Sequence, residues 1–344
     1  MAAPTVKQPA RGAVEHPIGA ARHWPKPYVA CYKCAPRPGC EVFSEATQMA
    51  FPVRRCALVG RLSDPRVAES VAALLPHLSA RQVQVIVGED APLGQTGQHV
   101  LRVAEREIGA HADLVIAIGG DGTLLYAAGL VARHGVPLLG INRGRLGFLT
   151  DVMPQDMFVC VDAALQGRLQ ADERPLLAAC LRSANGQPVA EALALNDVVL
   201  QKHATGRMLD FETKVDGDYV NTHAGDGIIV ASATGSTAYA LSCGGPIIEP
   251  HLDVLVMTPI CPHTLSDRPI VVSARSLIEV ELLERPDTYA QVACDGIVLG
   301  EIAPGDRLQV KSAAERITLL HPDGHDYYRL LRSKLHWGRG SFER

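Results

Sequence analysis

From residue 55 to about residue 141, apolar runs of strand length alternate with stretches of helical spacing. The apolar runs are Cys56–Gly60, Val83–Val87, Leu114–Ile118 and Pro137–Ile141, and each predicts a strand. Leu114–Ile118 is apolar throughout, as in strands that are buried on both faces of a parallel sheet. Strands that alternate with helices predict right-handed crossovers and therefore a doubly wound α/β layer.

Three of the intervening stretches predict helices. Asp64-Pro65 supplies an N-cap and a first-turn proline, and apolar residues recur on one helical face after it. The apolar positions within residues 100–108 have the spacing of a second helix. A third helix is predicted over Leu124–Arg133.

Beyond about residue 170 the pattern changes to a period of two. Residues 209–215 alternate between apolar and charged side chains, and Asp216-Gly217 separates them from a β-rich run at 219–222, which predicts a hairpin. Further short strands are expected at 194–200, 226–231, 253–258, 269–273, 278–283, 289–294 and 316–320. This half is predicted to be an all-β, sandwich-like domain.

The patterning divides the chain into four parts. Residues 1–50 contain seven prolines and no regular period, so a disordered extension is expected there. Residues 51–165 form the predicted α/β nucleotide-binding domain, and residues 166–320 form the β domain. Residues 321–344 are expected to pack back on the α/β domain as a C-terminal segment.

Composition and charge exclude several classes of protein. Apolar residues make up 47% of the chain and charged residues 20%, which is ordinary globular usage and excludes wholesale disorder. The net charge is −4, so the chain gives no reason to expect a nucleic-acid or anionic-membrane partner. Its apolar stretches are far shorter than the ~18 residues of a membrane span. We therefore expect a soluble, cytoplasmic protein.

The nine cysteines show no disulfide framework. Their number is odd, their spacing is irregular, and most have apolar neighbours, which indicates reduced thiols. Cys31-x2-Cys34 followed by Cys40 resembles zinc ligation, but no second pair or His-x3–5-His follows. We therefore predict that no side chain of this protein binds a metal. The alternative is a zinc site formed by these three cysteines.

The strongest chemical pattern is a buried strand that ends in Gly119-Gly120-Asp121-Gly122-Thr123, directly before a helix. Ligands lie at the carboxyl ends of strands in open α/β sheets, and glycines followed by a helix N-terminus favour a phosphate. We therefore predict that Gly119, Gly120, Gly122 and Thr123 bind phosphate. A carboxylate would repel phosphate, so Asp121 is interpreted as a base or indirect metal ligand. The alternative is an Asp-Gly turn with Thr123 as a cap.

This segment resembles a motif shared by NAD kinases, diacylglycerol and sphingosine kinases and 6-phosphofructokinases. Leu195–Val199 resembles the Asn-Glu/Asp motif of NAD kinases. Asp226-Gly227 with Thr234–Pro246 is similar to their long glycine-rich segment. Further blocks similar to the same family are Asn142–Leu149, Pro259–Pro269 and Lys334–Gly338. The resemblance covers about 51–344.

The resemblance implies an ATP-dependent NAD kinase. Such an enzyme transfers the γ-phosphoryl group of ATP to the 2′-hydroxyl of the adenosine ribose of NAD, giving NADP, with Asp121 as the general base. Mg²⁺ or another divalent cation is expected with ATP, held mostly by ATP oxygens and water. The resemblance also implies a homodimer or homotetramer formed through the β domain.

The NAD contacts that the resemblance implies come from both halves. They are Asp121, Gly122, Phe148, Asn196, Asp197, Arg207, Asp226, Thr237, Ala238, Tyr239, Ala240, Leu241 and Ser242. Asn196-Asp197 also suits vicinal ribose hydroxyls chemically, because an amide and a carboxylate can donate to and accept from both.

Structural alternatives apply to several of these residues. Asn196-Asp197 fits an Asx turn, Phe148 and Tyr239 fit core positions, and Arg207 fits a solvated surface. His263 lies in a proline-rich loop and is interpreted as structural.

Three positions depart from the family pattern. Ser232-Ala233 stands where Thr-Pro is usual, Ile297 stands where a polar residue is usual, and Asp197 replaces the more frequent glutamate. No Gly-x-Gly-x-x-Gly or P-loop pattern follows a predicted strand, so NAD is expected to be held as a substrate between the two domains. The alternative functions are a lipid kinase, which needs an apolar groove, and a catalytically silent NAD(P)-binding regulator, which needs no Asp121.

Overall fold

The structure is a computed structural model that describes residues 53–93, 100–144, 147–203, 207–284 and 290–337. Every described residue belongs to one compact unit, Ala46–Arg344. The predicted extension at 1–50, with Cys31, Cys34 and Cys40, lies outside the described residues.

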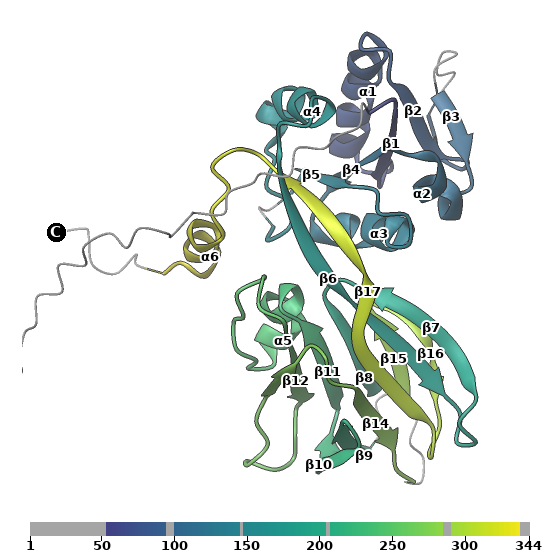
Figure 1. Cartoon of the computed structure of the whole chain (residues 1–344), viewed down its shortest axis with the longest axis vertical. Helices are drawn as coiled ribbons and strands as arrows, with labels where there is room; N and C mark the ends of the chain where they lie inside the picture. The colour runs from purple at the N-terminus through teal and green to yellow at the C-terminus, as the bar shows by residue number, and fades with distance from the viewer. Residues whose placement is uncertain (1–52, 94–99, 145–146, 204–206, 285–289, 338–344) are drawn as a thin grey trace, which may run out of the picture. The chain divides into compact units, whose positions relative to one another are not determined.

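The first part of the described chain is an α/β layer (Figure 1). Its elements are β1 (Arg55–Gly60), α1 (Pro65–Ser79), β2 (Gln84–Gly88), β3 (Val100–Val103), the 3₁₀ helix η1 (Glu105–Glu107), α2 (Ile108–His111), β4 (Leu114–Gly119), α3 (Asp121–Val131), β5 (Leu138–Asn142), the 3₁₀ helix η2 (Pro154–Asp156) and α4 (Met157–Leu165). The strands are parallel in the order β5-β4-β1-β2-β3, which confirms the predicted α/β class.

Helices cover both faces of this parallel sheet. On one face α1 and α4 pack on alternate residues of β1, β2 and β4. On the other face α2 and α3 pack on the residues between them. Each buried aliphatic side chain of this kind contributes about 1.5–3 kcal/mol. The predicted cap is confirmed, because the Asp64 side chain accepts the backbone N–H of Arg66 at 3.0 Å.

The predicted helix over residues 100–108 is wrong in its first half. Val100–Val103 forms β3, which pairs in parallel with β2, and the helix is limited to Ile108–His111 after a 3₁₀ turn. Apolar spacing over so few residues does not separate a short strand from a helical turn, and here the pairing with β2 decides.

The second part consists of two facing antiparallel sheets. Its elements are β6 (Gln170–Arg182), β7 (Pro188–Ala194), β8 (Asp197–Lys202), β9 (Leu209–Val215), β10 (Asp218–Gly225), β11 (Gly227–Ser232), the 3₁₀ helix η3 (Thr234–Thr237), α5 (Tyr239–Ser242), β12 (Val254–Ile260), β13 (Ile270–Ser273), β14 (Ile278–Leu282), β15 (Ala290–Cys294), β16 (Ile297–Ile302), β17 (Arg307–His321) and α6 (Tyr327–Leu335). One sheet has the order β13-β12-β11-β8-β15-β16, and its apolar side packs on β6, β9, β14 and β17.

The antiparallel sandwich confirms the predicted class of this half. The predicted hairpin is also present, since β9 and β10 pair around Asp216 and Gly217, whose φ angles are +54° and +88°. Two consecutive positive φ angles are typical of the tight turn that matches the twist of a hairpin.

Two long strands, β6 and β17, continue from the α/β part into the sandwich (Figure 1). β17 pairs with β14 near its start and, through Leu319 and Leu320, in parallel with β5 near its end. The sequence prediction missed β6, β7 and β16. It also missed the first nine residues of β17, because polar residues around the bulge at Ser312/Arg316 hide the alternation of apolar and polar positions in that strand. The domain limits at 165/166 and 320/321 stay a prediction.

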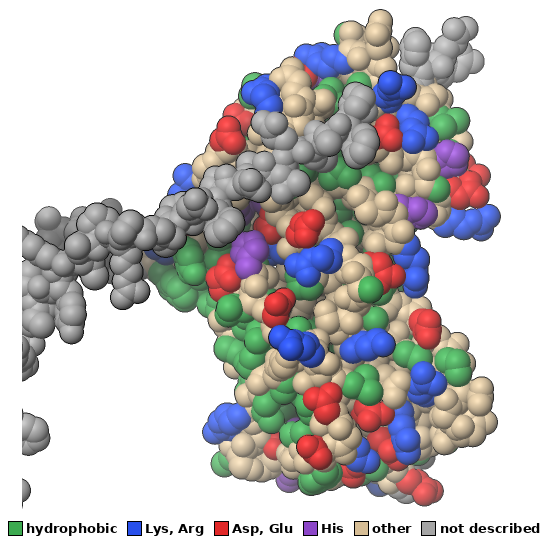
Figure 2. All heavy atoms as spheres, viewed as in Figure 1, with side chains coloured by type: hydrophobic (Ala, Val, Ile, Leu, Met, Phe, Trp, Pro, Cys, Tyr) green, Lys and Arg blue, Asp and Glu red, His purple; other side chains and the backbone are tan. Residues whose placement is uncertain are grey.

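The visible surface mixes both signs of charge, as Figure 2 shows for one face. No helix among the described residues is both long and apolar enough to cross a membrane.

Candidate functional site

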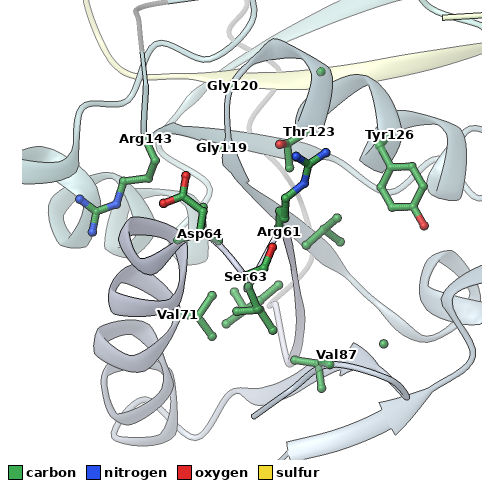
Figure 3. Close-up of a pocket in the computed structure, with 18 of the residues that line it drawn as sticks. Arg61, Ser63, Asp64, Val71, Val87, Gly119, Gly120, Thr123, Tyr126 and Arg143 are labelled. Atoms are coloured by element: carbon green, nitrogen blue, oxygen red, sulfur yellow. The ribbon is translucent and has the colours of Figure 1, made fainter. Parts of the chain in front are cut away.

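A cavity of about 950 Å³ opens at the carboxyl ends of the parallel strands (Figure 3). Gly60, Gly88 and Gly119, the last residues of β1, β2 and β4, all line it. β1 lies between β2 and β4. The chain passes from β1 to β2 and β3 on one side and then returns to β4 and β5 on the other, so the strand order reverses at this point. Such switch points are where open α/β sheets bind ligands.

Charged side chains of both signs line the cavity, and three of them are arginines: Arg61, Arg66 and Arg143. Figure 3 shows Arg143 at one end of the cavity, Tyr126 at the other and Arg61 between them. The Nε of Arg143 donates to the hydroxyl of Ser70 in α1, which orients its guanidinium. Together with the N-terminus of α3, these cations suit a ligand with several negative charges.

Gly120 and Gly122 have no internal reason to be glycine. A Cβ at either position would meet no protein atom within 4 Å, and neither residue has a positive φ. Both line the cavity at the start of α3. Their small size therefore leaves room for a ligand to approach the backbone N–H groups of the helix.

The Asp121 carboxylate is held by the loop that follows β5. Its Oδ2 accepts the backbone N–H of Phe148 at 2.7 Å. Its Oδ1 accepts the backbone N–H groups of Leu149 and Thr150 and the Thr150 hydroxyl, each at 3.0–3.1 Å. A carboxylate has about four acceptor positions, two on each oxygen. Oδ2 therefore keeps one position for a further donor, whereas Oδ1 does not.

Gly147 makes this arrangement possible. A Cβ at Gly147 would lie 1.7 Å from Asp121 Oδ1 and 2.4 Å from its Cγ. The loop can therefore approach the carboxylate closely enough to donate three backbone hydrogen bonds only because residue 147 has no side chain.

Asn196 and Asp197 lie at the start of β8, beside the β15–β16 turn. The Asp295 carboxylate accepts the backbone N–H groups of Leu195, Asn196 and Asp197 at 2.7–3.1 Å. Asp295 also lines the cavity, so Asn196 and Asp197 lie next to that cavity. We call these two residues the Asn196-Asp197 corner. The buried Oδ1 of Asn196 has no hydrogen-bond partner among the described residues, so it is available to a ligand hydroxyl.

This corner holds two acidic side chains in a low-dielectric environment. Burial, with the nearby Asp295 as a second cause, raises the pKa of Asp197 to about 7. Burial also raises the pKa of Asp295, although its three backbone donors oppose that rise. Hydroxyl donors from a ligand would stabilise the ionised form of Asp197.

The segment from η3 to α5 packs against the same corner. The Ser232 hydroxyl donates to the carbonyl of Leu195 at 2.6 Å and accepts the N–H of Gly235 at 3.1 Å. The backbone N–H of Ser232 donates to the carbonyl of Asn196 at 2.9 Å. Ser232, which stands where the family usually has threonine, thus anchors the strand end without a following proline.

The other predicted NAD contacts come from several elements and have different partners. The Asp226 carboxylate pairs with Lys202 at 2.7 Å, and Tyr239 is partly exposed with Asp226 and Asp197 among the charges around its hydroxyl. The Phe148 ring lies under Lys334 of α6, 5.5 Å from its ammonium. Arg207 is exposed just before β9.

The remaining predicted residues lie on either side of Tyr239 in the same segment. Thr237, Ala238, Ala240, Leu241 and Ser242 belong to the end of η3 and to α5. Ala240 is fully buried in a small core cluster with residues of β8, β11 and β12, so it presents no accessible atom to a ligand.

Sequence reasoning missed several residues of the cavity. Arg61 and Arg143 directly follow β1 and β5, and the rule that ligands lie at carboxyl ends would have indicated both. Asp295 had no usable signal, because Asp-Gly occurs at four other places in the chain and the contact is formed with residues about 100 positions away.

Two family models match the chain. Residues 44–169 match the ATP-NAD kinase N-terminal domain, and residues 195–321 match the ATP-NAD kinase C-terminal domain.

Curated relatives match over nearly their whole length. An NAD kinase from Nitrosococcus oceani is 41% identical over 291 residues, which are 85% of this chain and 99% of the relative. An NAD kinase from Ectopseudomonas mendocina is 46% identical over 286 residues, which are 83% and 96%.

Solved structures have the same fold. An NAD kinase from Archaeoglobus fulgidus, solved in complex with ATP, is 27% identical with a TM-score of 0.65 over 82% of this chain and 98% of that one. A yeast NADH kinase complexed with NADH is 24% identical with a TM-score of 0.78, over 84% and 89%. The latter likeness concerns the fold alone.

Proposed function

The chain belongs to the NAD kinase family, and from this premise we propose how its own residues divide the transfer of a phosphoryl group from ATP to NAD. The cavity at the carboxyl ends of β1, β2 and β4 takes ATP. The corner formed by Asn196 and Asp197 takes the adenosine ribose of NAD, and Asp121, at the start of α3 among the glycines that line the cavity, is the base.

The ATP assignment rests on Gly120 and Gly122. These glycines face the cavity, and the protein itself fills no space above them. The phosphates would lie against the first N–H groups of α3, near Arg61 and Arg143. Because phosphoryl transfer depends mainly on positioning and charge neutralisation, this arrangement supplies most of what the reaction needs.

A single alanine tests this assignment. Gly122→Ala adds a methyl group that clashes with no protein atom, and alanine is favoured over glycine in a helix by about 1 kcal/mol. We expect an unchanged or higher melting temperature, a KM for ATP that rises by roughly tenfold, the equivalent of one lost hydrogen bond, and a smaller rise in the KM for NAD. Steady-state kinetics with each substrate varied would measure this. An unchanged KM for ATP would place the phosphates elsewhere.

The NAD assignment rests on the free acceptors of the corner. Asn196 Oδ1 is buried without a partner, and the Asp197 carboxylate is buried beside Asp295. Vicinal ribose hydroxyls would donate to both side chains, which would satisfy the amide oxygen and stabilise the ionised carboxylate. The η3–α5 segment, from Thr237 to Ser242, would continue the contact with the rest of the dinucleotide.

The base assignment follows from the hydrogen bonds of Asp121. Oδ1 is occupied by three donors that orient the carboxylate, whereas Oδ2 has one acceptor position left. Oδ2 is therefore the atom that would accept the proton of the 2′-hydroxyl as the γ-phosphoryl group moves to that oxygen. The bond between the γ-phosphorus and the bridging oxygen of ADP breaks in the same reaction.

Magnesium would enter with ATP. Four carboxylates line the cavity: Asp64, Asp90, Glu105 and Asp295. Three of them are already engaged, by Arg66, by Tyr126 and by the backbone of residues 195–197. This fits a cation bound mostly by phosphate oxygens and water, with few ligands from the chain.

Asp197→Asn is expected to make the protein more stable and its affinity for NAD lower. Between about pH 4 and pH 7 the folded protein keeps a proton on Asp197 that the unfolded chain has already lost. The free energy of unfolding therefore falls as the pH rises through this range. Removing the acid should therefore give a stability advantage that grows by roughly 2–3 kcal/mol from pH 5 to pH 8. At pH 8 the KM for NAD should rise about tenfold, because a charge-assisted hydrogen bond is lost.

Thermal melts at both pH values, with kinetics at pH 8, would measure both effects. Glu191→Ala, at an exposed acid of β7, serves as the control and should change neither quantity. A lower stability of Asp197→Asn at pH 8, or an equal rise of the KM for ATP, would contradict this assignment.

We also propose a cytoplasmic homodimer or homotetramer. The six cysteines among the described residues are all free thiols, as expected in a reducing compartment. Exposed apolar residues at two sheet edges, Ile270 and Val271 on β13 and Ile297 and Val298 on β16, favour assembly through the sandwich.

A further inference from the structure

Asp151, His321 and His325 converge from three segments of the chain. Asp151 follows the loop after β5, His321 ends β17, and His325 precedes α6. Asp151 Oδ2 lies 2.9 Å from Nδ1 of His321 and 2.7 Å from Nδ1 of His325. The two imidazole rings stack with centroids 3.9 Å apart, and the three ligand atoms all lie within 4.8 Å of one another.

The hydrogen bonds leave buried polar atoms of this cluster unsatisfied. Asp151 Oδ1 is buried without a hydrogen-bond partner among the described residues, and His321 Nε2 is buried with the Asp172 carboxylate 3.5 Å away and no hydrogen bond of good geometry. The His321 side chain is only 2% exposed. The two imidazoles stabilise the carboxylate through Oδ2, but a buried Oδ1 without a donor is costly and leaves this oxygen free for a further ligand.

A second layer of residues supports His321. Its Nε2 lies 3.5 Å from Asp172 Oδ2, and Asp172 is bound in turn by the Arg174 guanidinium at 2.8 and 2.5 Å. Histidines that bind a metal through one nitrogen usually present the other to a carboxylate, which fixes the ring. The Asp172–His321 pair has this arrangement.

We propose that Asp151, His321 and His325 bind a divalent transition-metal ion, with zinc as the best match. Two imidazole nitrogens and one carboxylate oxygen are a donor set typical of zinc, and water would complete the tetrahedron. The set does not suit magnesium, which prefers oxygen ligands. None of the three residues lines the ATP cavity, so this ion is separate from the cation that accompanies ATP.

The ion would connect the C-terminal segment to the loop that holds Asp121. Asp151 directly follows Thr150, which donates two of the four hydrogen bonds to the Asp121 carboxylate. His325 precedes α6, whose Lys334 lies over Phe148 of the same loop. A bound metal would therefore stabilise the loop geometry at a distance from the reacting atoms.

The test is a zinc titration of the full chain, purified without a polyhistidine tag, by calorimetry against a competing chelator. We expect about one equivalent of tightly bound Zn²⁺. His325→Gln and, as a second variant, Asp151→Asn should weaken binding at least ~tenfold, because each removes one ligand. His77→Gln is the matched control, since His77 forms a separate pair with Asp162 at 2.8 Å and should bind zinc like the parent.

Two further readouts exclude the cysteine group. Changing Cys31, Cys34 and Cys40 to serine should leave the zinc stoichiometry unchanged, and Co²⁺ should bind without the near-ultraviolet band of thiolate ligation. Zinc should also raise the melting temperature of the parent and not of His325→Gln. Absence of binding at micromolar zinc, binding that survives both ligand changes, or loss of binding in the serine variant would each overturn the proposal.

Discussion

Asp121→Asn is expected to lower kcat by at least ~100-fold, because general-base catalysis typically contributes about 10²–10⁴-fold. The amide oxygen can take the place of Oδ1, which accepts three donors. The amide nitrogen then takes the place of Oδ2, where it can accept no proton and faces the N–H of Phe148, 2.7 Å from Oδ2 in the parent. The unpaired N–H should also cost about 1–3 kcal/mol of stability.

Thr150→Val separates the role of the Asp121 carboxylate as a base from the role of the hydrogen bonds that orient it. It removes the hydroxyl that donates to Oδ1 at 3.0 Å and leaves the free position of Oδ2 intact. We expect a loss of stability of about 1 kcal/mol and a kcat within roughly tenfold of the parent. Near-normal turnover of Asp121→Asn, or an equally severe effect of Thr150→Val, would exclude Oδ2 of Asp121 as the base. Steady-state kinetics and thermal melts of both variants give the comparison.

Gly147→Ala is expected to be as damaging as the loss of the base itself. Its methyl group would lie 1.7 Å from Asp121 Oδ1, so either the loop moves away or the carboxylate leaves its position. Both outcomes break several of the four hydrogen bonds, and kcat should fall by about 100-fold or more. The melting temperature should fall as well.

Gly129→Ala is the matched control, on the same helix as Asp121. Gly129 is exposed, and a Cβ there meets nothing within 4 Å, so kcat should be unchanged and stability unchanged or higher. The double variant Gly147→Ala/Asp121→Asn should lose little more activity than either single variant, because both act on the same carboxylate. Additive losses would mean that Gly147 acts independently of Asp121.

The parallel strands could be predicted because each is buried on both faces and therefore apolar throughout. β4 is the clearest case, since all six of its residues are buried. β6 and β17 could not be predicted in full. Polar residues such as Asp172 and Arg174 of β6 pair with each other and with Thr234 and His251 from later segments, so the apolar period that marks a strand is interrupted.

The candidate site could be predicted only where it is local in sequence. Gly119–Thr123 and Asn196-Asp197 are short motifs, and the structure places both beside the cavity. The donors to Asp121 come from 27–29 positions downstream, and Asp295 reaches the corner from almost 100 positions away. No spacing in the sequence encodes contacts of this kind, because they depend on how loops fold back on the sheet.

The chain phosphorylates NAD with ATP. The most direct measurement incubates the full chain with NAD, Mg²⁺ and γ-³²P-labelled ATP, separates the nucleotides, and offers the product to a dehydrogenase that accepts only 2′-phosphorylated NADP. We predict labelled NADP, one phosphoryl group per molecule, formed by the parent and reduced at least ~100-fold in Asp121→Asn. Hydrolysis of ATP without labelled NADP, or label that appears only in an added lipid alcohol, would contradict the account.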